Sequence, residues 1–157
     1  MENAHGYPEE IAAYVDSVFS GGAWHGASLM GTLRKLSAEQ ARRENAAGYS
    51  AWKVALHCAY WKHRAAARIA AKGTLPRFAR SPADFPALPD RPDEAAWKAD
   101  LAFIAEIHER FLGVAAAQPW AAFSGERRAK VLREILGAAA HDAYHTGMIR
   151  NIGIPGL

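Results

Sequence analysis

The strongest evidence for the fold is the stretch VLREILGAAAHDAYH, residues 131–145. Its large apolar residues recur every three or four positions, at Val131, Leu132, Ile135 and Leu136. This is the spacing of an amphipathic α-helix. Ser124 is a good N-cap upstream of it, and no proline interrupts residues 127–150. We therefore expect one continuous helix over residues 127–150.

This stretch also carries two histidines four residues apart, His141 and His145. Four residues make about one helical turn, so both imidazoles leave the helix on the same face and can bind one cation. The small residues 137–140 just before them allow another helix to approach closely and leave room for a cavity. Pairs with this spacing are also common as ordinary surface or core residues, so the pair alone is weak evidence.

A third histidine, His57, lies inside the apolar run VALHCAYW, residues 54–61. An unpaired imidazole on such an apolar face would carry a desolvation cost. The simpler alternative is a buried histidine that is hydrogen-bonded to a carbonyl. If His57 meets the other two histidines, three neutral imidazoles from two helices would form a divalent-metal site with positions left open for water or substrate.

Apolar periodicity predicts further helices, over residues 9–19, 24–36, 50–71 and 93–117. The paired glycines at residues 21–22 favour a break between the first two. Ser37 and Gln40 have the spacing of a capping box, which predicts a short helical turn. Many alanines and few β-branched runs favour closely packed helices over strands, so the predicted fold class is all-α.

The connection of residues 74–92 is long and contains five prolines. So long a segment without secondary structure would normally count against an assignment. Here it could be the long crossover that joins two parallel helices, as some four-helix bundles require. We therefore expect a four-helix bundle with a long crossover connection.

The composition of the 157-residue chain predicts one domain, residues 1–157. The net charge of +3 is small and no basic stripe is interleaved with aromatics, so nucleic acid is not an expected partner. The single cysteine, Cys58, fits a reducing compartment. Residues 1–8 lack the apolar core of a signal peptide, and no run is long enough to span a bilayer. We expect a cytoplasmic protein without a membrane partner.

Four residues are candidates for the surroundings of the histidines. Asp142 either forms an ion pair between helices or orients a ligand. Trp61 is expected to fill the core, although it lies one turn beyond the third histidine and could form a cavity wall. Tyr144 fits packing better than catalysis. His25 could line the mouth of a pocket, although a surface position fits it better. Cys58 is expected to face elsewhere as a small buried hydrophobe rather than a nucleophile.

The other histidines and tryptophans fit structural positions. We expect His63 at the surface, because lysine and arginine flank it. His108, near the polar edge of its helix, is expected to be a structural or surface residue. Trp52 and Trp97 are expected to fill the core.

The chain resembles the DinB-like/YfiT-like superfamily of metal-dependent enzymes. The resemblance rests on residues 24–26 (WHG), 36–41 (LSAEQA), 50–61 (SAWKVALHCAYW) and 141–147 (HDAYHTG). It implies a four-helix bundle with a long crossover connection. It also implies a metal triad with one histidine on the second bundle helix and two on the fourth, which fall on His57, His141 and His145. One departure is visible, because the family pattern Gly-Gln-Ile reads here as Gly147-Met148-Ile149.

The resemblance implies an activity as well. Members of the superfamily catalyse thiol-dependent S-transfer and isomerisation with low-molecular-weight thiols. Our first hypothesis is therefore a metal-dependent enzyme that holds Zn²⁺ or Ni²⁺, with a small-molecule substrate and a low-molecular-weight thiol as a second cofactor. A metal-bound thiolate or water would be the nucleophile, with S-transfer favoured over hydrolysis.

Two other hypotheses stay open at this stage. The first is a non-catalytic helical module that binds a metal or another ligand. The second is a helical interaction protein whose histidines are incidental. Under any of the three hypotheses, an alanine-rich helix face could support a homodimer.

Overall fold

The computed structural model describes residues 9–152, and within this range every regular element is a helix. The helices are α1 (Glu9–Ser20), α2 (Leu29–Leu33), α3 (Ala38–Arg42), α4 (Ala51–Ile69), α5 (Glu94–Ala116), the short 3₁₀ helix η1 (Trp120–Ala122) and α6 (Gly125–Arg150). The predicted all-α class is confirmed for this part of the chain. None of these helices is long and apolar enough to cross a membrane.

Most helices begin directly after a residue whose side chain caps their first turn. The Ser50 hydroxyl accepts from the backbone N–H of Lys53, and the Ser124 hydroxyl accepts from that of Arg127. Ser37 and Gln40 form the predicted capping box at α3. Each cap satisfies an amide that would otherwise lack a partner in the first helical turn, so these starts are fixed by local chemistry.

One predicted helix is much shorter than expected. Periodicity suggested a helix over residues 24–36, but only Leu29–Leu33 is helical. Gly22 and Gly26 both adopt positive φ, at 84° and 104°, which does not fit a right-handed helix. Trp24 is fully exposed, so this segment buries no apolar face before Leu29. The predicted break at the paired glycines is confirmed.

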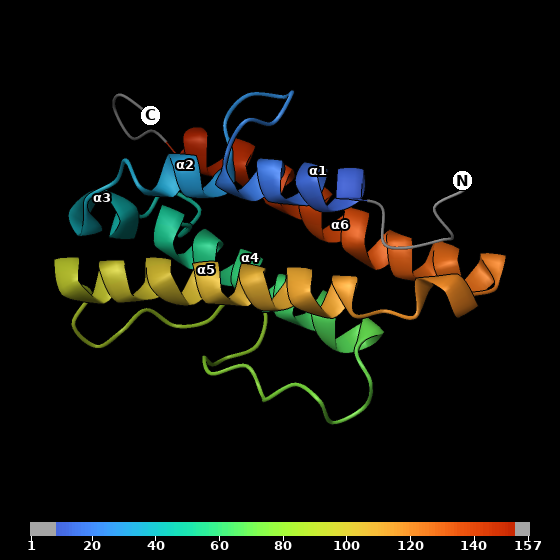
Figure 1. Ribbon diagram of the computed structural model, residues 1–157. Coiled ribbons are helices and arrows are strands. Elements are labelled where there is room, and N and C mark those ends of the chain that lie inside the picture. The colour runs from blue at the N-terminus through green and yellow to red at the C-terminus, as the bar shows by residue number, and fades with distance from the viewer. Residues whose placement is uncertain (1–8, 153–157) are drawn as a thin grey trace.

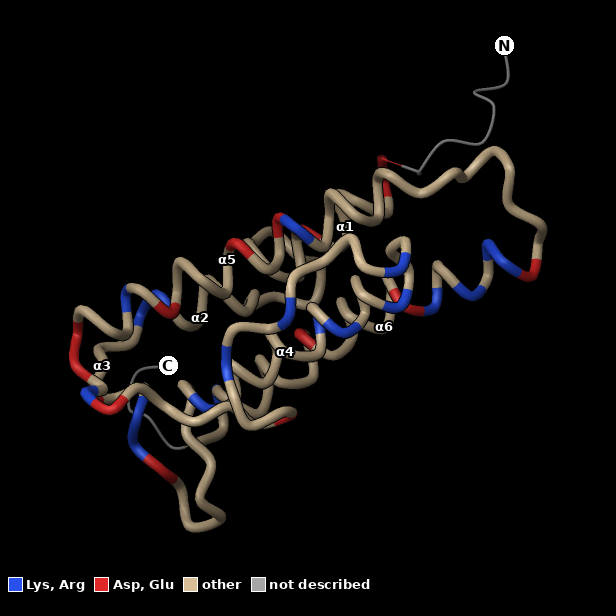
Figure 2. Tube along the Cα trace, turned by 90° about the horizontal axis from the view of Figure 1, so that it is seen from below, with Lys and Arg blue, Asp and Glu red and all other residues tan. Residues whose placement is uncertain are grey.

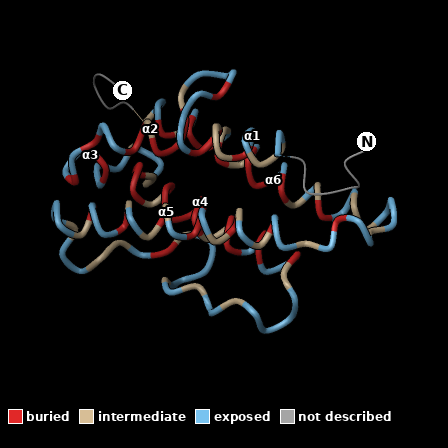
Figure 3. The backbone as a smooth tube through the Cα atoms, viewed as in Figure 1, coloured by how far each residue is buried: buried red, intermediate tan, exposed pale blue. Residues whose placement is uncertain are grey.

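The four long helices lie side by side (Figure 1). Helices α4 and α5 run in one direction, whereas α1 and α6 run in the other. The connection of residues 70–93 leaves the end of α4 and returns along the outside of the molecule to the start of α5. Helix α4 packs against both α5 and α6, and most of its residues are buried (Figure 3). A central α4 can therefore present side chains to both neighbours.

The core consists of two apolar clusters that follow one another along the helices. One is built around Trp52 and Trp97, whose rings lie 4.8 Å apart, and both are buried as predicted. The other includes Phe111 and Ile135. The buried Lys62 lies on α4 between residues that belong to the two clusters.

Candidate metal centre

Three histidines from two helices converge in the structure. His57 on α4 and His141 and His145 on α6 each offer a candidate ligand atom, and these atoms lie within 4.8 Å of one another. The ring centroids are 4.3 Å apart for the pair on α6, and 5.0 Å and 4.7 Å apart between His57 and each of them. Ligand nitrogens of a tetrahedral zinc site are about 3.3 Å apart, so small side-chain rotations would bring these atoms to ligating positions.

Burial keeps two of these imidazoles neutral. It lowers the pKa of His141 to about 4, and the neighbouring His145 and His57 act in the same direction. Burial, followed by His57, likewise lowers the pKa of His145 to about 4. Since a metal ligand must be an unprotonated imidazole, both residues are ready to ligate at neutral pH without losing a proton.

Asp84, in the connection of residues 70–93, orients the third imidazole. Its backbone carbonyl lies 2.8 Å from Nδ1 of His57, and its carboxylate Oδ1 lies 3.2 Å from the same nitrogen. When His57 donates its Nδ1–H to this carbonyl, the lone pair is left on Nε2. Trp61 donates its indole N–H to the same Oδ1 at 2.6 Å. The ring of Phe85 stacks on that of His57, with the ring centroids 4.1 Å apart and an angle of 16° between the ring planes.

Sequence reasoning missed both Asp84 and Phe85. They lie more than 25 residues beyond His57, in a segment with no helical period, so no spacing rule links them to it. Asp84 has φ of 70°, a left-handed conformation that aspartate tolerates better than most residues. The only signal in the sequence was an aspartate next to a phenylalanine in a proline-rich connection. This signal does not identify the residue that they contact.

A bound cation would fit the donor set. Nδ1 of His145 is buried and has no hydrogen-bond partner among the described residues. A buried polar atom without a partner carries a free-energy cost that ligation would remove. His57 does hydrogen-bond to a carbonyl, as the simpler alternative expected, but it does so through Nδ1. The three residues together can hold a transition metal and leave coordination positions open.

The other site candidates lie at different distances from this centre. Trp61 and His141 line a cleft of about 150 Å³ that also borders Gly137. Tyr144 is 72% exposed and its ring meets that of His145 edge-on at 4.9 Å, so it lies at the rim rather than in the packing. His25 is exposed in the connection between α1 and α2.

Asp142 forms an ion pair with the buried Lys62, which is the simpler of its two expected roles. Its carboxylate, the Cys58 thiol and a ring nitrogen of His141 also lie within 4.8 Å of one another. Cys58 is buried as expected. The expectation that it faces elsewhere is wrong, because it lies on the side of α4 that packs against α6. Burial, and next Asp142, raise the pKa of Cys58 well above its usual value, so its thiol stays protonated.

The structure corrects the expectation for His63 and agrees with the structural role expected for His108. His63 is buried, not at the surface, and its ring lies 5.4 Å from Phe78 of the connection that covers it. His108 is fully buried in a structural position. Met148 is half-buried and packs against the core around Trp52.

Comparisons of the chain with protein-family models, with curated proteins and with solved structures found no match. The arrangement of the three histidines is therefore the basis for a functional conclusion.

Proposed function

We propose that this protein is a divalent-metal-dependent enzyme whose metal is held by His57, His141 and His145. The observation that carries the proposal is the approach of their ligand atoms to within 4.8 Å. It is supported by the unpartnered Nδ1 of His145 and by the lowered pKa of both histidines on α6. A bound Zn²⁺ or Ni²⁺ would lower the pKa of a ligating thiol or water and make it a nucleophile at neutral pH.

The residues around the centre each have a defined task in this proposal. Asp84 fixes the orientation of His57 through Nδ1 and directs its Nε2 lone pair away from the loop. Phe85 covers one face of the same ring and limits the access of water. Burial keeps His141 and His145 unprotonated. These groups orient and protect the ligands but do not donate a proton. The electrophile must therefore carry a leaving group that departs without being protonated.

The reaction that we propose is S-transfer from a low-molecular-weight thiol to a small electrophilic substrate, with hydrolysis as the second choice. A small substrate is supported by the cleft of about 150 Å³ that reaches His141 between Trp61 and Gly137. A Cβ added at Gly137 would meet nothing within 4 Å, so this wall of the cleft is open. Basic and acidic residues are interspersed along the helices (Figure 2), an arrangement that favours a small molecule over nucleic acid.

We propose further that the fold is the four-helix bundle with a long crossover that the DinB-like/YfiT-like superfamily would have. Two features support this assignment. The connection of residues 70–93 links two helices that run in the same direction (Figure 1). One candidate ligand lies on α4 and two lie on α6, which is the distribution that the resemblance implies.

A non-catalytic metal-binding module is the second candidate. It is favoured by the state of two carboxylates at the centre. Asp84 accepts from Trp61, and Asp142 is paired with Lys62. One oxygen of each carboxylate is thereby engaged in a structural contact, although Oδ1 of Asp142 has no hydrogen-bond partner among the described residues.

Elemental analysis tests the site directly. Wild-type protein, His141→Ala and His25→Ala would be purified without a tag and dialysed without chelator. We expect near-stoichiometric metal in the wild type and in His25→Ala, whose histidine is exposed and serves as the matched control. His141→Ala should lose the metal because two imidazoles bind it far more weakly than three. The proposal is wrong if the wild type holds no metal and added Zn²⁺ or Ni²⁺ does not raise its melting temperature.

Chelation then separates the enzyme from the module. If metal-free protein keeps its helical circular dichroism but loses thiol transfer to an electrophile such as a chloronitroarene, the metal is catalytic. If it unfolds and never had transfer activity, the metal is structural.

A further inference from the structure

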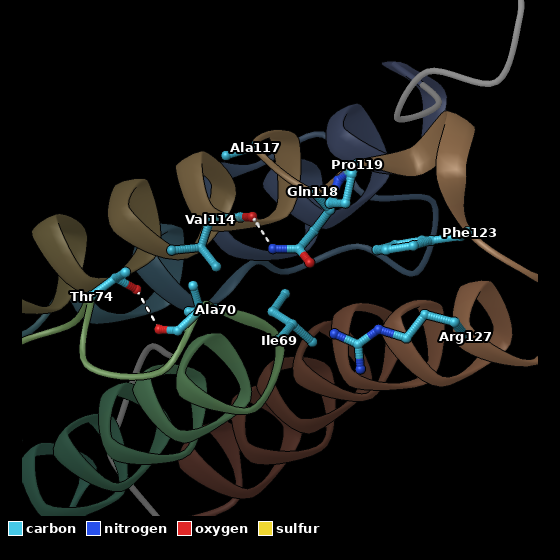
Figure 4. A pocket seen from close by; sticks show the side chains of 10 residues that line it. Ile69, Ala70, Thr74, Val114, Ala117, Gln118, Pro119, Phe123 and Arg127 are labelled. Carbon is cyan, nitrogen blue, oxygen red and sulfur yellow. Dashed lines mark hydrogen bonds between the residues drawn. The ribbon is translucent and has the colours of Figure 1, made fainter.

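A second cavity, of about 460 Å³, lies at the end of the molecule where α4 and α5 stop and α6 begins (Figure 4). It is remote from the three histidines. Ile69 in its wall is about 18 Å along α4 from His57, and Arg127 is about 21 Å along α6 from His141. The cavity volume falls within the range of about 300–1,000 Å³ that small-molecule sites occupy.

The walls of this cavity are mostly aliphatic. Ile69 and the C-cap residue Ala70 at the end of α4 face Val114 and the C-cap residue Ala117 at the end of α5, and Phe123 closes one side. In Figure 4 these side chains surround one space, and they come from two stretches that are far apart in the sequence, residues 69–74 and 114–127. An aliphatic group placed there would be removed from water on several sides, which is the main source of affinity in such sites.

One positive charge faces this space. The guanidinium of Arg127 extends across the opening toward Ile69 in Figure 4. Its contact with the Phe123 ring, at 5.5 Å, is a cation–π interaction that leaves its N–H donors free. Arg127 makes no ion pair with any described residue, and none of the described residues that line the cavity is acidic. The charge of this cavity therefore suits an anion.

Hydrogen bonds and helix dipoles at the helix ends around the cavity also favour an anion. The last carbonyls of a helix carry partial negative charge, which would repel a carboxylate. One of these carbonyls already accepts a hydrogen bond from a side chain that lines the cavity, because Gln118 donates its amide N–H to the carbonyl of Val114 at 2.9 Å. Just beyond the end of α4, Thr74 donates its hydroxyl to the carbonyl of Ala71 at 2.7 Å. Arg127 lies in the first turn of α6, where the helix dipole favours negative charge.

From these observations we infer that the cavity binds a small amphipathic anion, namely a monocarboxylic acid with an aliphatic tail. The carboxylate pairs with Arg127, and the tail lies between Ile69 and Val114. This ligand site is independent of the proposed metal centre, because no residue is shared between the two.

Titration calorimetry with octanoate tests this inference, with octanamide as the uncharged analogue of the same length. We expect saturable binding of octanoate at one site and at least tenfold weaker binding of octanamide. Arg127→Gln should weaken octanoate binding at least tenfold, because the ion pair is lost. Arg128→Gln is the matched control, since Arg128 stacks over Trp120 outside the cavity, and it should bind like the wild type.

Two more variants locate the bound acid. Val114→Trp fills the cavity and should abolish binding; if it lowers the melting temperature, Ala117→Leu blocks the exposed side of the same cavity instead. His141→Ala should leave octanoate binding unchanged. The inference is overturned if octanoate does not saturate, if octanamide binds equally well, or if the loss occurs in His141→Ala and not in Arg127→Gln. The last result would place the carboxylate at the three histidines.

Discussion

At the scale of single residues, Asp84 determines how one imidazole of the candidate metal centre is held. It contacts Nδ1 of His57 twice, through the backbone carbonyl and through the carboxylate. The two contacts have separate effects. The carbonyl fixes the tautomer and the ring orientation, whereas the negative charge makes the imidazole a better electron donor to a metal. A substitution that removes only the charge can therefore measure the second effect alone.

Asp84→Asn is the substitution that removes this charge. Asparagine tolerates the left-handed φ of 70° and keeps the backbone carbonyl, so the loop should retain its conformation. We expect metal affinity to fall about tenfold, the lower end of the effect typical for groups behind a ligand. Asp90→Asn, an exposed position in the same connection, is the control and should bind metal like the wild type. Equal affinities in competition titrations with a chromogenic chelator would show that the carboxylate does not act on His57.

At the scale of helices, a buried ion pair joins α4 to α6. Lys62 and Asp142 are almost completely buried and bonded to each other, with side-chain exposures of 3% and 2%. Burying two charges is costly, and a well-packed apolar pair in their place could be as stable. The loss of one partner is different, because it leaves the other charge buried without compensation.

Lys62→Met tests this argument. We expect the free energy of unfolding to fall by about 3–5 kcal/mol in urea denaturation, because Asp142 must then be buried alone or take up a proton. Lys53→Met is the matched control on the same helix. Lys53 is paired with Glu44 at the surface, with exposures of 33% and 49%, so its loss should cost less than about 1 kcal/mol. Equal costs for the two variants would contradict the argument.

At the scale of the whole molecule, a chain of polar groups crosses the interior and joins all four long helices. The exposed end is Asp16 on α1, which lies 3.1 Å from Nε2 of His108 on α5. Nδ1 of the same ring lies 3.0 Å from the ammonium of Lys62 on α4, which in turn pairs with Asp142 on α6. This geometry suits a neutral imidazole that donates from Nε2 to Asp16 and accepts at Nδ1 from Lys62.

Stability should therefore depend on the protonation of His108. Burial, and next the positive charge of Lys62, lower its pKa to about 3 in the folded protein. In the unfolded chain this histidine takes up a proton near pH 6.5. The unfolded state thus binds more protons between about pH 6.5 and pH 3, so the stabilising contribution is complete above pH 6.5 and is lost as the pH falls.

Denaturation of chelator-treated protein at several pH values measures this effect. One histidine contributes a slope of at most about 1.4 kcal/mol per pH unit within that window. His141 and His145 contribute with the same sign, since their pKa values are also lowered. His108→Gln should have a shallower slope than the wild type below pH 6.5. An unchanged slope would mean that His108 is protonated in the folded protein.

Most of the helices and the three candidate ligands could be predicted from the sequence. The prediction of Ser50 and Ser124 as N-caps was correct, because a cap hydrogen bond joins residues three positions apart. The pairing of His141 with His145 was equally local, since one helical turn fixes it. For the helix over residues 24–36 the same reasoning was wrong, because apolar spacing does not register the positive φ of Gly22 and Gly26.

The surroundings of those ligands depend on the tertiary structure and could not be predicted. Asp84 reaches His57 because of the path that residues 70–93 take across the outside of α4, and no sequence period encodes this path. The same connection buries His63, which has charged neighbours in the sequence and was expected at the surface. Burial depends on which faces two distant segments present to each other. Helix periodicity predicts the apolar face of one helix. Which other segment packs against that face depends on the packing of the whole molecule.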